Sequence, residues 1–450
     1  MTASAPTKER VLLLNPPGAR RYARDKYCTS ISFADYYWPQ IDLLVLSGRL
    51  KEKYAVTLLD AIVARQRPAK LLSQLAAEKY KACIFLTSLA SLPEDFAFIE
   101  ALKRLWPETE MIGNGGILLA RGEEIMARNW FLDAALLDFT TEHILDYLDG
   151  QRPAPDMITR KDGHIIRGPR RQGATFAYPT PLHELVGRGR YHLPIAPAPK
   201  FTVSITSTGC PNGCVFCVPR QVGFRRRDQD NALEELAAVE RAGFSHVVFH
   251  DATFVNDRDY VSRLCDRMLQ NRLRLKWACQ TRIDSVDEEI LGLMRSAGCR
   301  VIEYGVESGD NRTLAAMNKG ITVEQIRETL AATNRQGLRS VAFFIVGMPG
   351  ETETTMRKTV DLAVAINCDY ASFSVPRPQP GTKLGESAGP IPAAADELAQ
   401  RMRALAYRKF YLRPAYWWKR LKGTESFYEL RLQFRIFASL LGGLLKPKSP

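Results

Sequence analysis

The sequence predicts an α/β protein with two successive parallel-sheet domains and a basic helical extension at the C-terminus. Short apolar runs alternate with helical stretches along residues 10–149, and the alternation begins again at Phe201. A segment rich in proline and glycine separates the two series. We therefore expect a first domain at 1–150, a linker at 151–200, a second domain at 201–394 and the extension at 395–450.

Length and composition agree with a soluble globular protein of two domains. The chain has 450 residues, of which 46% are hydrophobic and 25% charged. No run reaches the roughly 18–20 apolar residues that a membrane span needs. The first ten residues lack the apolar core of a signal peptide. We expect a cytoplasmic protein, and free thiols agree with a reducing compartment.

The first series predicts a doubly wound parallel sheet. Strands are expected at 10–14, 56–60, 82–87, 110–113 and, more weakly, 134–137. Helices are expected at about 40–53, 68–79, 93–106 and 142–149. Residues 18–39 show no regular pattern and are rich in arginine and tyrosine. Ligands of such sheets bind at the carboxyl ends of the strands.

The second series contains six strand–helix units. Strands are expected at 202–207, 246–250, 274–280, 300–305, 340–346 and 370–375. Helical stretches separate them at about 231–242, 258–271, 286–297, 311–336 with a break at Gly320, and 353–366. In barrels built from such units, active residues lie at the carboxyl ends of the strands.

Three cysteines directly after the first of these six strands are the candidate metal ligands. Cys210, Cys214 and Cys217 have the spacing Cys-x3-Cys-x2-Cys, within a loop that contains Gly209, Pro211 and Gly213. Thiolates are the ligands of iron–sulfur clusters. A 4Fe–4S cluster held by three local cysteines keeps one iron open for chemistry, as an open catalytic metal site does. The alternatives are a closed cluster with a distant fourth cysteine, or a zinc site.

The other six cysteines are scattered through the chain. Most of them lie in apolar segments, where a free cysteine behaves as a small hydrophobic residue. We expect them to be core residues and not ligands: Cys28, Cys83, Cys265, Cys279, Cys299 and Cys368.

The cysteine triplet, with Phe216 before its last member, resembles the motif of radical S-adenosylmethionine (radical SAM) enzymes, whose domain is a partial (β/α)6 barrel. The resemblance implies that the open iron binds SAM and that the reduced cluster cleaves it to a 5′-deoxyadenosyl radical. It also implies that SAM is held at the strand ends. The residues expected to bind SAM are Phe216, Asp251, Arg282, Glu307, Ser308, Gly347 and Met348.

The first series resembles the N-terminal, Rossmann-like cobalamin-binding domain of one large radical SAM class. The resemblance implies that the loops after its strands surround the corrin, with the following candidate residues: Asn15, Pro16, Thr87, Ser88, Asn114, Gly115, Gly116 and Glu142. Two features depart from the family. The usual Gly-Glu-Gly-Glu is reduced to Phe139-Thr140-Thr141-Glu142, and no Asp-x-His-x-x-Gly motif supplies a histidine ligand to cobalt. The alternative is a degenerate domain used for substrate shape or docking.

The C-terminal extension carries most of the net charge. The chain has a formal charge of +13, and residues 401–450 contain 12 Lys/Arg but only 2 Asp/Glu. Aromatic residues and leucines accompany the basic ones, a composition that suits either contact with an anionic membrane or a cap on the barrel. No motif for nucleic-acid binding accompanies the charge.

Together these resemblances imply a radical SAM enzyme with a 4Fe–4S cluster, SAM and cobalamin. The leading interpretation is a cobalamin-dependent methyltransferase that acts on an unactivated carbon, or on phosphorus, of a small molecule or lipid. Its electron donor would be a flavodoxin or ferredoxin. The alternatives are a radical SAM cyclase, oxidase or rearrangement enzyme without methyl transfer, and a non-catalytic iron–sulfur protein for electron transfer or sensing.

Overall fold

The computed structural model describes residues 8–24, 29–31, 36–171, 173–186, 191–387, 389 and 391–445. The chain folds into two compact units. Unit 1 comprises Met1–Tyr191 and Arg225–Ala238, and unit 2 comprises His192–Phe224 and Val239–Pro450. The domain boundaries expected from the sequence differ from the bounds of these two units, and they remain a proposal.

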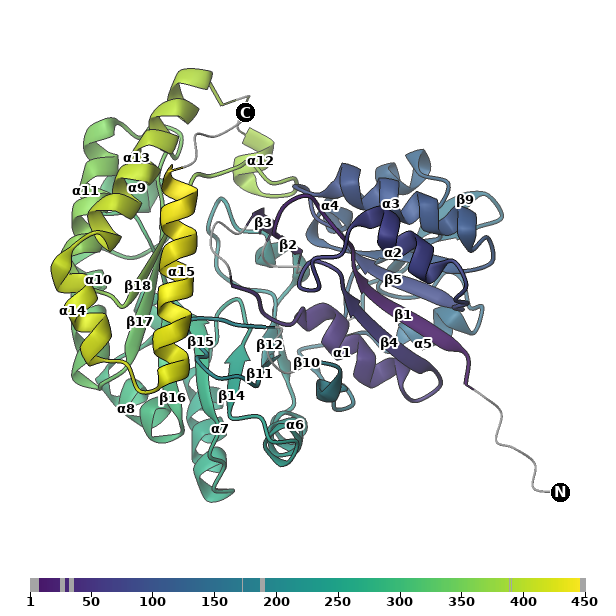
Figure 1. Cartoon of the computed structure of the whole chain (residues 1–450), viewed down its shortest axis with the longest axis horizontal. Helices are drawn as coiled ribbons and strands as arrows, with labels where there is room; N and C mark the ends of the chain where they lie inside the picture. Colours follow the sequence, from purple (N-terminus) through teal and green to yellow (C-terminus); the bar gives the residue numbers. More distant parts are fainter. Residues whose placement is uncertain are drawn as a thin grey trace. The chain divides into compact units, whose positions relative to one another are not determined.

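Unit 1 is built on a seven-stranded sheet in the order β4-β1-β5-β6-β7-β8-β9 (Figure 1). The first five of these strands are parallel: β4 (Ala55–Asp60), β1 (Arg10–Asn15), β5 (Ala82–Leu86), β6 (Glu110–Asn114) and β7 (Ala134–Leu136). The chain order reverses between β1 and β5, as in flavodoxin-like sheets. Ligands of such sheets bind outside the carboxyl ends of the strands at this reversal.

Helices cover both faces of this sheet, which confirms the doubly wound prediction. One face carries α1 (Ile41–Leu50) and α5 (His143–Leu148). The other carries α2 (Pro68–Leu75), α3 (Leu92–Leu105) and α4 (Gly116–Arg128). The strands β1 and β5 are almost fully buried, because both of their faces are covered.

The sequence reasoning missed the two antiparallel strands at the end of this sheet. They are β8 (Met157–Lys161) and β9 (His164–Arg167), and they lie within the segment expected to be a linker. The side chains of Met157 and Ile158 are fully buried. Other short strands of unit 1 are β2 (Tyr22–Arg24), which pairs with β3 (Thr29–Ile31), and β10 (Thr175–Phe176), which pairs with β13 (Arg225–Arg227).

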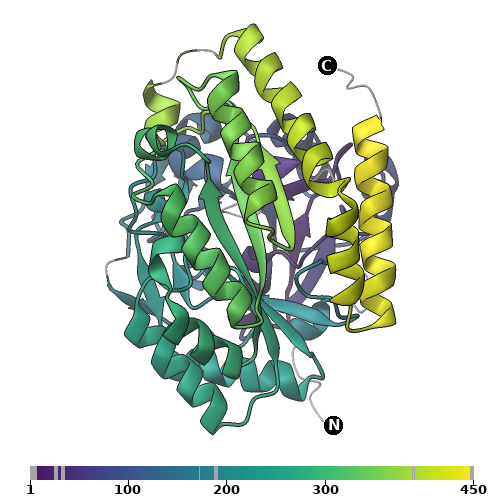
Figure 2. The ribbon, with the colours of Figure 1, turned by 90° about the vertical axis from the view of Figure 1, so that its left-hand side faces the viewer.

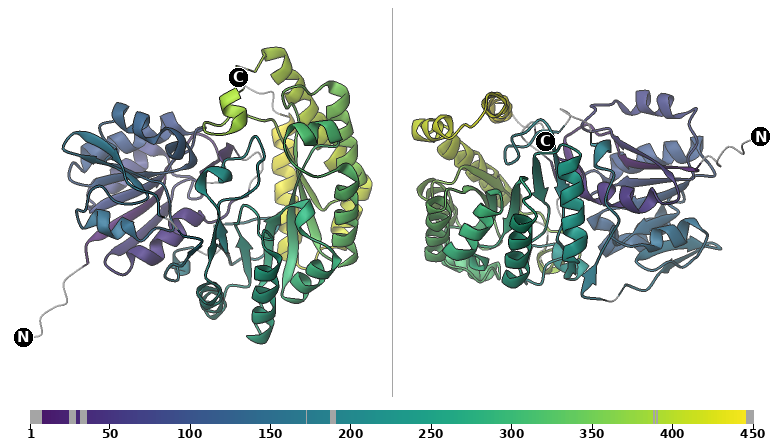
Figure 3. Two further views of the ribbon diagram at one scale, coloured as in Figure 1. Left: turned by 180° about the vertical axis from the view of Figure 1, so that it is seen from behind. Right: turned by 90° about the horizontal axis from the view of Figure 1, so that it is seen from below.

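Unit 2 contains six parallel strands whose order in the sheet follows the chain. They are β11 (Phe201–Ser204), β14 (His246–Phe249), β15 (Lys276–Thr281), β16 (Cys299–Glu307), β17 (Arg339–Ile345) and β18 (Tyr370–Ser374). Helices pack on the outer face of this curved sheet (Figures 2 and 3). Those that follow β14 to β17 are α7 (Arg258–Gln270), α8 (Glu288–Ser296), α9 (Asn311–Ala316), α10 (Val323–Arg335) and α11 (Glu353–Ala365). The prediction of a partial (β/α)6 barrel is confirmed.

Side-chain caps fix the starts of the outer helices. Asp257, Asp287 and Asp310 accept hydrogen bonds from backbone N–H groups at the starts of α7, α8 and α9. Thr322 and Thr352 do the same for α10 and α11. Such caps satisfy donors that the first helical turn leaves unpaired. Each helix therefore begins at a defined residue after the loop that leaves its strand.

The C-terminal helices belong to unit 2. They are α12 (Lys383–Ser387), α13 (Ala393–Tyr411), α14 (Pro414–Lys422) and α15 (Phe427–Leu445). Two tyrosines of α13 reach the backbone of β18: the Tyr407 hydroxyl accepts from Phe373 N at 3.2 Å, and the Tyr411 hydroxyl donates to Ala371 O at 2.7 Å. Among the described residues, no helix is both long and apolar enough to cross a membrane.

Five of the six scattered cysteines are core residues, as predicted. Cys83, Cys265, Cys279, Cys299 and Cys368 have no exposed surface. The sixth, Cys28, lies outside the described residues.

Candidate functional site

The cysteine loop of unit 2 starts directly beyond β11, and Asp251 fixes its first turn. The Asp251 carboxylate accepts hydrogen bonds from Thr206 N at 3.0 Å, Thr206 Oγ1 at 2.8 Å and Ser207 Oγ at 2.6 Å. Burial raises the pKa of Asp251, and these hydrogen bonds counteract part of that rise. The expected contact of Asp251 with SAM stays a prediction. The structure gives this residue a positioning role in the loop.

Gly209 allows the chain to turn into the first cysteine. Its φ of +70° lies in the left-handed region, and a Cβ at this position would stand 1.9 Å from the carbonyl oxygen of Gly223. A side chain would therefore need the backbone to move. Only glycine therefore fits position 209 without a movement of the backbone.

Three hydrogen bonds to its backbone hold the cysteine loop against two other segments of unit 2. Val215 N donates to Met317 O at 3.1 Å, and Leu384 N donates to Val215 O at 2.8 Å. Asn318 Nδ2 donates to Gly213 O at 2.8 Å. The loop is thus tied to the turn after α9 and to α12, which gives the sulfurs a defined position.

Two side-chain N–H groups lie close to cysteine sulfurs. Asn212 Nδ2 lies 3.3 Å from Cys210 Sγ, and Arg282 donates from a terminal guanidinium nitrogen to Cys214 Sγ at 3.7 Å. Burial, followed by the neighbouring sulfurs of Cys214 and Cys210, raises the pKa of the Cys217 thiol to about 12. A thiolate at Cys217 would therefore need a metal bound to it, because metal binding displaces the thiol proton.

The donor set fits an iron–sulfur cluster. It consists of three thiols without a histidine or carboxylate among them, which is the ligand chemistry of iron–sulfur sites. Within the described part of the chain, no three His, Cys, Asp or Glu side chains converge on a point suited to one metal ion. The choice between a cluster and a zinc ion at these three thiols stays a prediction.

Arg282 contacts the cysteine loop on one side and Asp284 and Lys319 on the other. Its guanidinium donates to both carboxylate oxygens of Asp284, at 2.8 and 2.7 Å, and to Lys319 O at 2.5 Å. These bonds hold the planar group in one orientation, with its remaining nitrogen toward Cys214. The positive charge there would stabilise a thiolate.

Lys319 was missed from the sequence, and it forms a buried ion pair with Glu307. Lys319 Nζ lies 2.8 Å from Glu307 Oε1, and the two side chains are 6% and 9% exposed. Glu307 follows a β-bulge and has a φ of +69°. A Cβ on Gly305 would stand 2.5 Å from Glu307 Oε1 and 2.7 Å from Lys319 Nζ, so a side chain there would displace the tips of this pair. The sequence shows a lysine shortly after α9, but it gives no indication that this lysine pairs with Glu307.

The remaining SAM candidates lie at the next strand ends. Ser308 is fully buried, and its hydroxyl lies 3.2 Å from Thr359 Oγ1 of α11. The backbone N–H groups of Gly347 and Met348 both donate to Glu351 Oε2 at 2.8 Å. Glu351 therefore fixes the turn after β17, and Ser308 ties the turn after β16 to α11.

Apolar side chains cover the other side of the cysteine loop. Val215 and Phe216 pack against a buried cluster of four residues: Met317, Ile345, Met348 and Leu384. A cavity of about 550 Å³ opens here, lined by Val215, Met348, Leu384 and neighbours from α9 and α12. This brings Phe216 and Met348 together, and their contact with SAM stays a prediction.

Glu303 is a second residue that the sequence reasoning missed. It lies on β16 directly beside Gln280 of β15, and His250 follows the adjacent strand β14. Strand alternation places Gln280 and Glu303 on the inner face of the sheet, opposite Cys279 and Ile302. Burial raises the pKa of Glu303 to about 7, and the nearby His250 opposes that rise. A carboxyl among the apolar residues Val301, Ile302, Tyr304 and Val306 was the available signal.

In unit 1, a buried arginine joins the loops after several strands. Arg24 is fully buried and lies 2.6 Å from Asp95 Oδ1. It also donates to Asn15 Oδ1 at 2.9 Å and to Pro16 O at 2.7 Å. Asn15 in turn donates to Asp60 Oδ1 at 2.9 Å. The network holds the ends of β1 and β4 and the start of α3 in one arrangement.

The other cobalamin candidates of unit 1 lie at the same edge of the sheet. Thr87 donates to Asp95 at 2.9 Å, and Asn114 donates to Asp42 at 2.8 Å. Gly115 approaches the Thr87 backbone so closely that a Cβ would stand 2.0 Å from its carbonyl oxygen. The structure thus brings together Asn15, Pro16, Thr87, Ser88, Asn114, Gly115 and Gly116 at the ends of β1, β5 and β6.

Glu142 is the exception among these candidates. Glu142 stands at the start of α5. Its side chain is half exposed and lies 3.6 Å from Arg171. The loop before it is held by Asp138, which accepts from Thr140 and pairs with Arg225. The expected contact of Glu142 with cobalamin stays a prediction.

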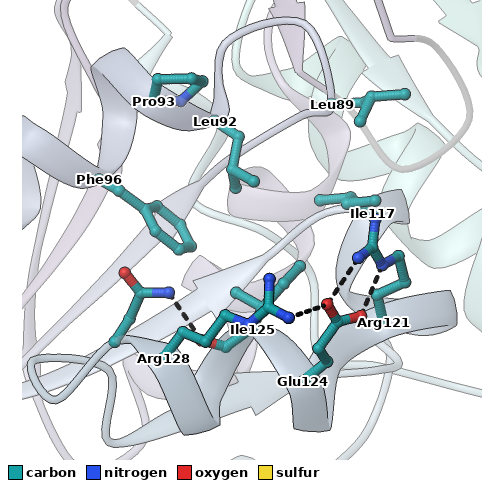
Figure 4. Close-up of a pocket in the computed structure, with 10 residues that line it drawn as sticks. Leu89, Leu92, Pro93, Phe96, Ile117, Arg121, Glu124, Ile125 and Arg128 are labelled. Carbon is teal, nitrogen blue, oxygen red and sulfur yellow. Dashed lines mark hydrogen bonds and ion pairs between the residues drawn. The ribbon is translucent and has the colours of Figure 1, made fainter.

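A cavity of about 360 Å³ opens beside these loops (Figure 4). Leu89, Leu92 and Phe96 line one side, and Ile117 and Ile125 of α4 line the other. Arg121, Glu124 and Arg128 form ion pairs at its rim. Its lining is mainly apolar, with Arg121, Glu124, Arg128 and Asn129 as the polar members.

Comparison with known proteins identifies the second unit. A family model described as the radical SAM superfamily matches residues 204–363. The chain contains a radical SAM domain. The match starts at the last residue of β11 and includes the cysteine loop and the ends of β14 to β17. The chain is an enzyme with a radical SAM domain.

Relatives of this chain include methyltransferases and a cyclase. An uncharacterized methyltransferase of Pyrococcus horikoshii is 25% identical over 78% of this chain and 78% of its own length. An anaerobic magnesium-protoporphyrin IX monomethyl ester cyclase of Rubrivivax gelatinosus is 27% identical over 46% of this chain and 42% of its own length. The first match covers 78% of this chain, and the second covers 46%.

One solved structure resembles nearly the whole chain. It is the radical SAM methyltransferase TsrM from Kitasatospora setae with cobalamin and a [4Fe-4S] cluster bound. The likeness has a TM-score of 0.70 at 18% identity and covers 97% of this chain and 100% of TsrM. It shows that the two share a fold.

Proposed function

We propose that this enzyme holds a 4Fe–4S cluster on Cys210, Cys214 and Cys217 and cleaves SAM to a 5′-deoxyadenosyl radical. The observation that carries this proposal is the cysteine loop itself, with three thiols and a donating arginine in a fixed arrangement. With SAM at its open iron, the cluster would supply the electron for SAM cleavage. A flavodoxin or ferredoxin is the proposed donor of that electron.

The surrounding residues bind, orient and shield SAM. Arg282 would balance the charge of the thiolates, and the Lys319–Glu307 pair places a carboxylate near the strand end where ribose hydroxyls need an acceptor. The apolar cluster behind Phe216 would exclude water from the adenosyl group. Stray hydrogen-atom donors would otherwise quench a radical before it reached the substrate.

We propose further that unit 1 binds cobalamin and that the enzyme transfers a methyl group. The chain reversal between β1 and β5 and the fixed loops at that edge support the site. The apolar cavity beside Leu89 and Ile117 fits the flat base that cobalamin carries on its nucleotide arm. When bound, methylcobalamin would supply the methyl group. The proposed acceptor is an unactivated carbon, or phosphorus, of a small molecule or lipid in the cytoplasm.

Methyl transfer is tested with SAM deuterated in its methyl group, a chemical reductant and an extract of small metabolites. We expect 5′-deoxyadenosine together with a deuteromethylated product, and no such product from enzyme prepared without cobalamin. Formation of 5′-deoxyadenosine with an unmethylated product, at equal rates with and without cobalamin, would favour a cyclase or oxidase. The likeness to the magnesium-protoporphyrin cyclase supports that second candidate.

A further inference from the structure

The last two helices, α14 and α15, bury one side each against the start of the barrel strands. Arg420 of α14 is 2% exposed and lies 3.3 Å from Asp369 and 3.2 Å from Glu429 of α15. Glu429 also pairs with Arg339 at 2.6 Å. Trp417 packs against Phe437 with ring centroids 4.2 Å apart. The two helices are therefore a fixed part of unit 2.

The opposite sides of these helices expose large apolar side chains. Trp418 is 63% exposed, Leu421 47%, Phe427 80% and Phe434 56%. On α15, Phe427, Arg431 and Phe434 follow helical spacing, while Leu432 and Ile436 are buried on the other side. We call Trp418, Leu421, Phe427 and Phe434 the aromatic face. Helical spacing places Trp418 and Leu421 on one side of α14, and Phe427 and Phe434 on one side of α15, so each helix presents large apolar side chains to solvent.

The charges around the aromatic face are basic. Lys422 and Arg431 are exposed beside it, and Lys422 Nζ lies 4.8 Å from the centre of the Trp418 ring. Residues 412–450 contain only two acidic residues. Glu429 is buried, and Glu425 pairs with Lys276 at 3.2 Å and with Arg339 at 3.4 Å. Both carboxylates are thus held by basic partners of the barrel.

We propose that the aromatic face binds the surface of an anionic lipid bilayer. Aromatic and leucine side chains insert at the level of the headgroups, and neighbouring lysines and arginines pair with anionic lipids. The helices lie on the surface without crossing it, in agreement with the absence of a membrane-spanning helix among the described residues. This inference is independent of the chemistry proposed above, because no residue of the face belongs to the cysteine loop or the strand ends.

The test is co-sedimentation of the full-length reconstituted enzyme with two kinds of vesicle, phosphatidylcholine alone and phosphatidylcholine with phosphatidylserine. We expect sedimentation with the anionic vesicles that weakens as salt rises. The variant Trp418→Ser/Phe427→Ser/Phe434→Ser should lose this binding. The variant Lys422→Glu/Arg431→Glu should reduce it by more than about tenfold, because each basic residue near an anionic surface contributes about 1 kcal/mol.

Two matched controls change exposed residues of unit 1. Leu105→Ser/Trp130→Ser removes exposed apolar side chains, and Lys70→Glu reverses an exposed charge. Both should sediment as the unmodified enzyme does. All variants should keep the cluster absorbance and SAM cleavage, which shows that they fold. Equal sedimentation of variants and controls, or no sedimentation at all, would overturn the proposal. So would a dimer in gel filtration that only the aromatic variant dissociates, since the face would then join two copies of this chain.

Discussion

The strand ends of the two units differ in where their polar groups are directed. In unit 2, Arg282 and Asn212 donate toward cysteine sulfurs, so the side chains define the chemistry of what binds there. In unit 1, Arg24, Asp95 and Asn15 bond to one another and shape the loops, and the adjacent cavity is apolar. A site with dedicated ligands can be identified from residue types, whereas a site made of loop shape cannot.

The largest effect should come from removing one cluster ligand. Cys214→Ser leaves two cysteines for the cluster, so we expect loss of the iron–sulfur absorbance and of 5′-deoxyadenosine formation. The matched control is Cys368→Ala, which removes a buried thiol of the same unit and should retain both signals. Full cluster loading of Cys214→Ser would contradict the assignment of the ligands.

Filling the cavity of unit 1 should separate the two sites. Leu92→Trp places a ring in the 360 Å³ space, and we expect the amount of cobalamin retained after desalting to fall by about tenfold, the cost of blocking a well-fitted apolar pocket. SAM cleavage should continue. Leu105→Trp, on the exposed side of the same helix α3, is the control and should bind cobalamin normally. Equal retention by both variants would remove the cavity from the proposed site.

Breaking the Arg24 network tests whether it shapes unit 1. Arg24→Met leaves Asp95 buried without its partner, so we expect the free energy of unfolding to fall by about 3–5 kcal/mol. Arg104→Met breaks an exposed pair with Glu100 and should cost less than about 1 kcal/mol. Urea unfolding monitored by circular dichroism measures both. Similar losses in the two variants would show that the buried network contributes no more to the free energy of unfolding than an exposed ion pair does.

The smallest effect concerns Glu303 inside the barrel. Burial raises its pKa from 4.5 to about 7, so the folded protein holds the proton more tightly than the unfolded chain. Stability should therefore fall as pH rises between about 4.5 and 7. Glu303→Gln should make this dependence shallower, whereas the exposed Glu328→Gln should leave it unchanged. Urea midpoints across this pH range give the slopes, and identical slopes would contradict the buried position of the carboxyl.

The strand–helix alternation and the cysteine spacing were enough to predict both sheets and the cluster loop, because these signals are local in the sequence. Pairs that join distant segments gave no such signal. Lys319 meets Glu307 only because β16 bulges at its end, and Arg24 reaches Asp95 only once β1 and β5 are neighbours. The hairpin β8–β9 was missed because prolines and glycines dominate the segment around it, although Met157 and Ile158 are buried.

The central claim is that one chain holds a cluster in unit 2 and cobalamin in unit 1. The most direct measurement is anaerobic reconstitution with iron, sulfide and hydroxocobalamin, followed by desalting and a visible spectrum with metal analysis. We predict that iron, sulfide and cobalt are retained together, and that Leu92→Trp loses only the cobalt. A preparation that keeps the cluster but no cobalt would contradict the claim, and would leave a radical SAM enzyme whose unit 1 serves another purpose.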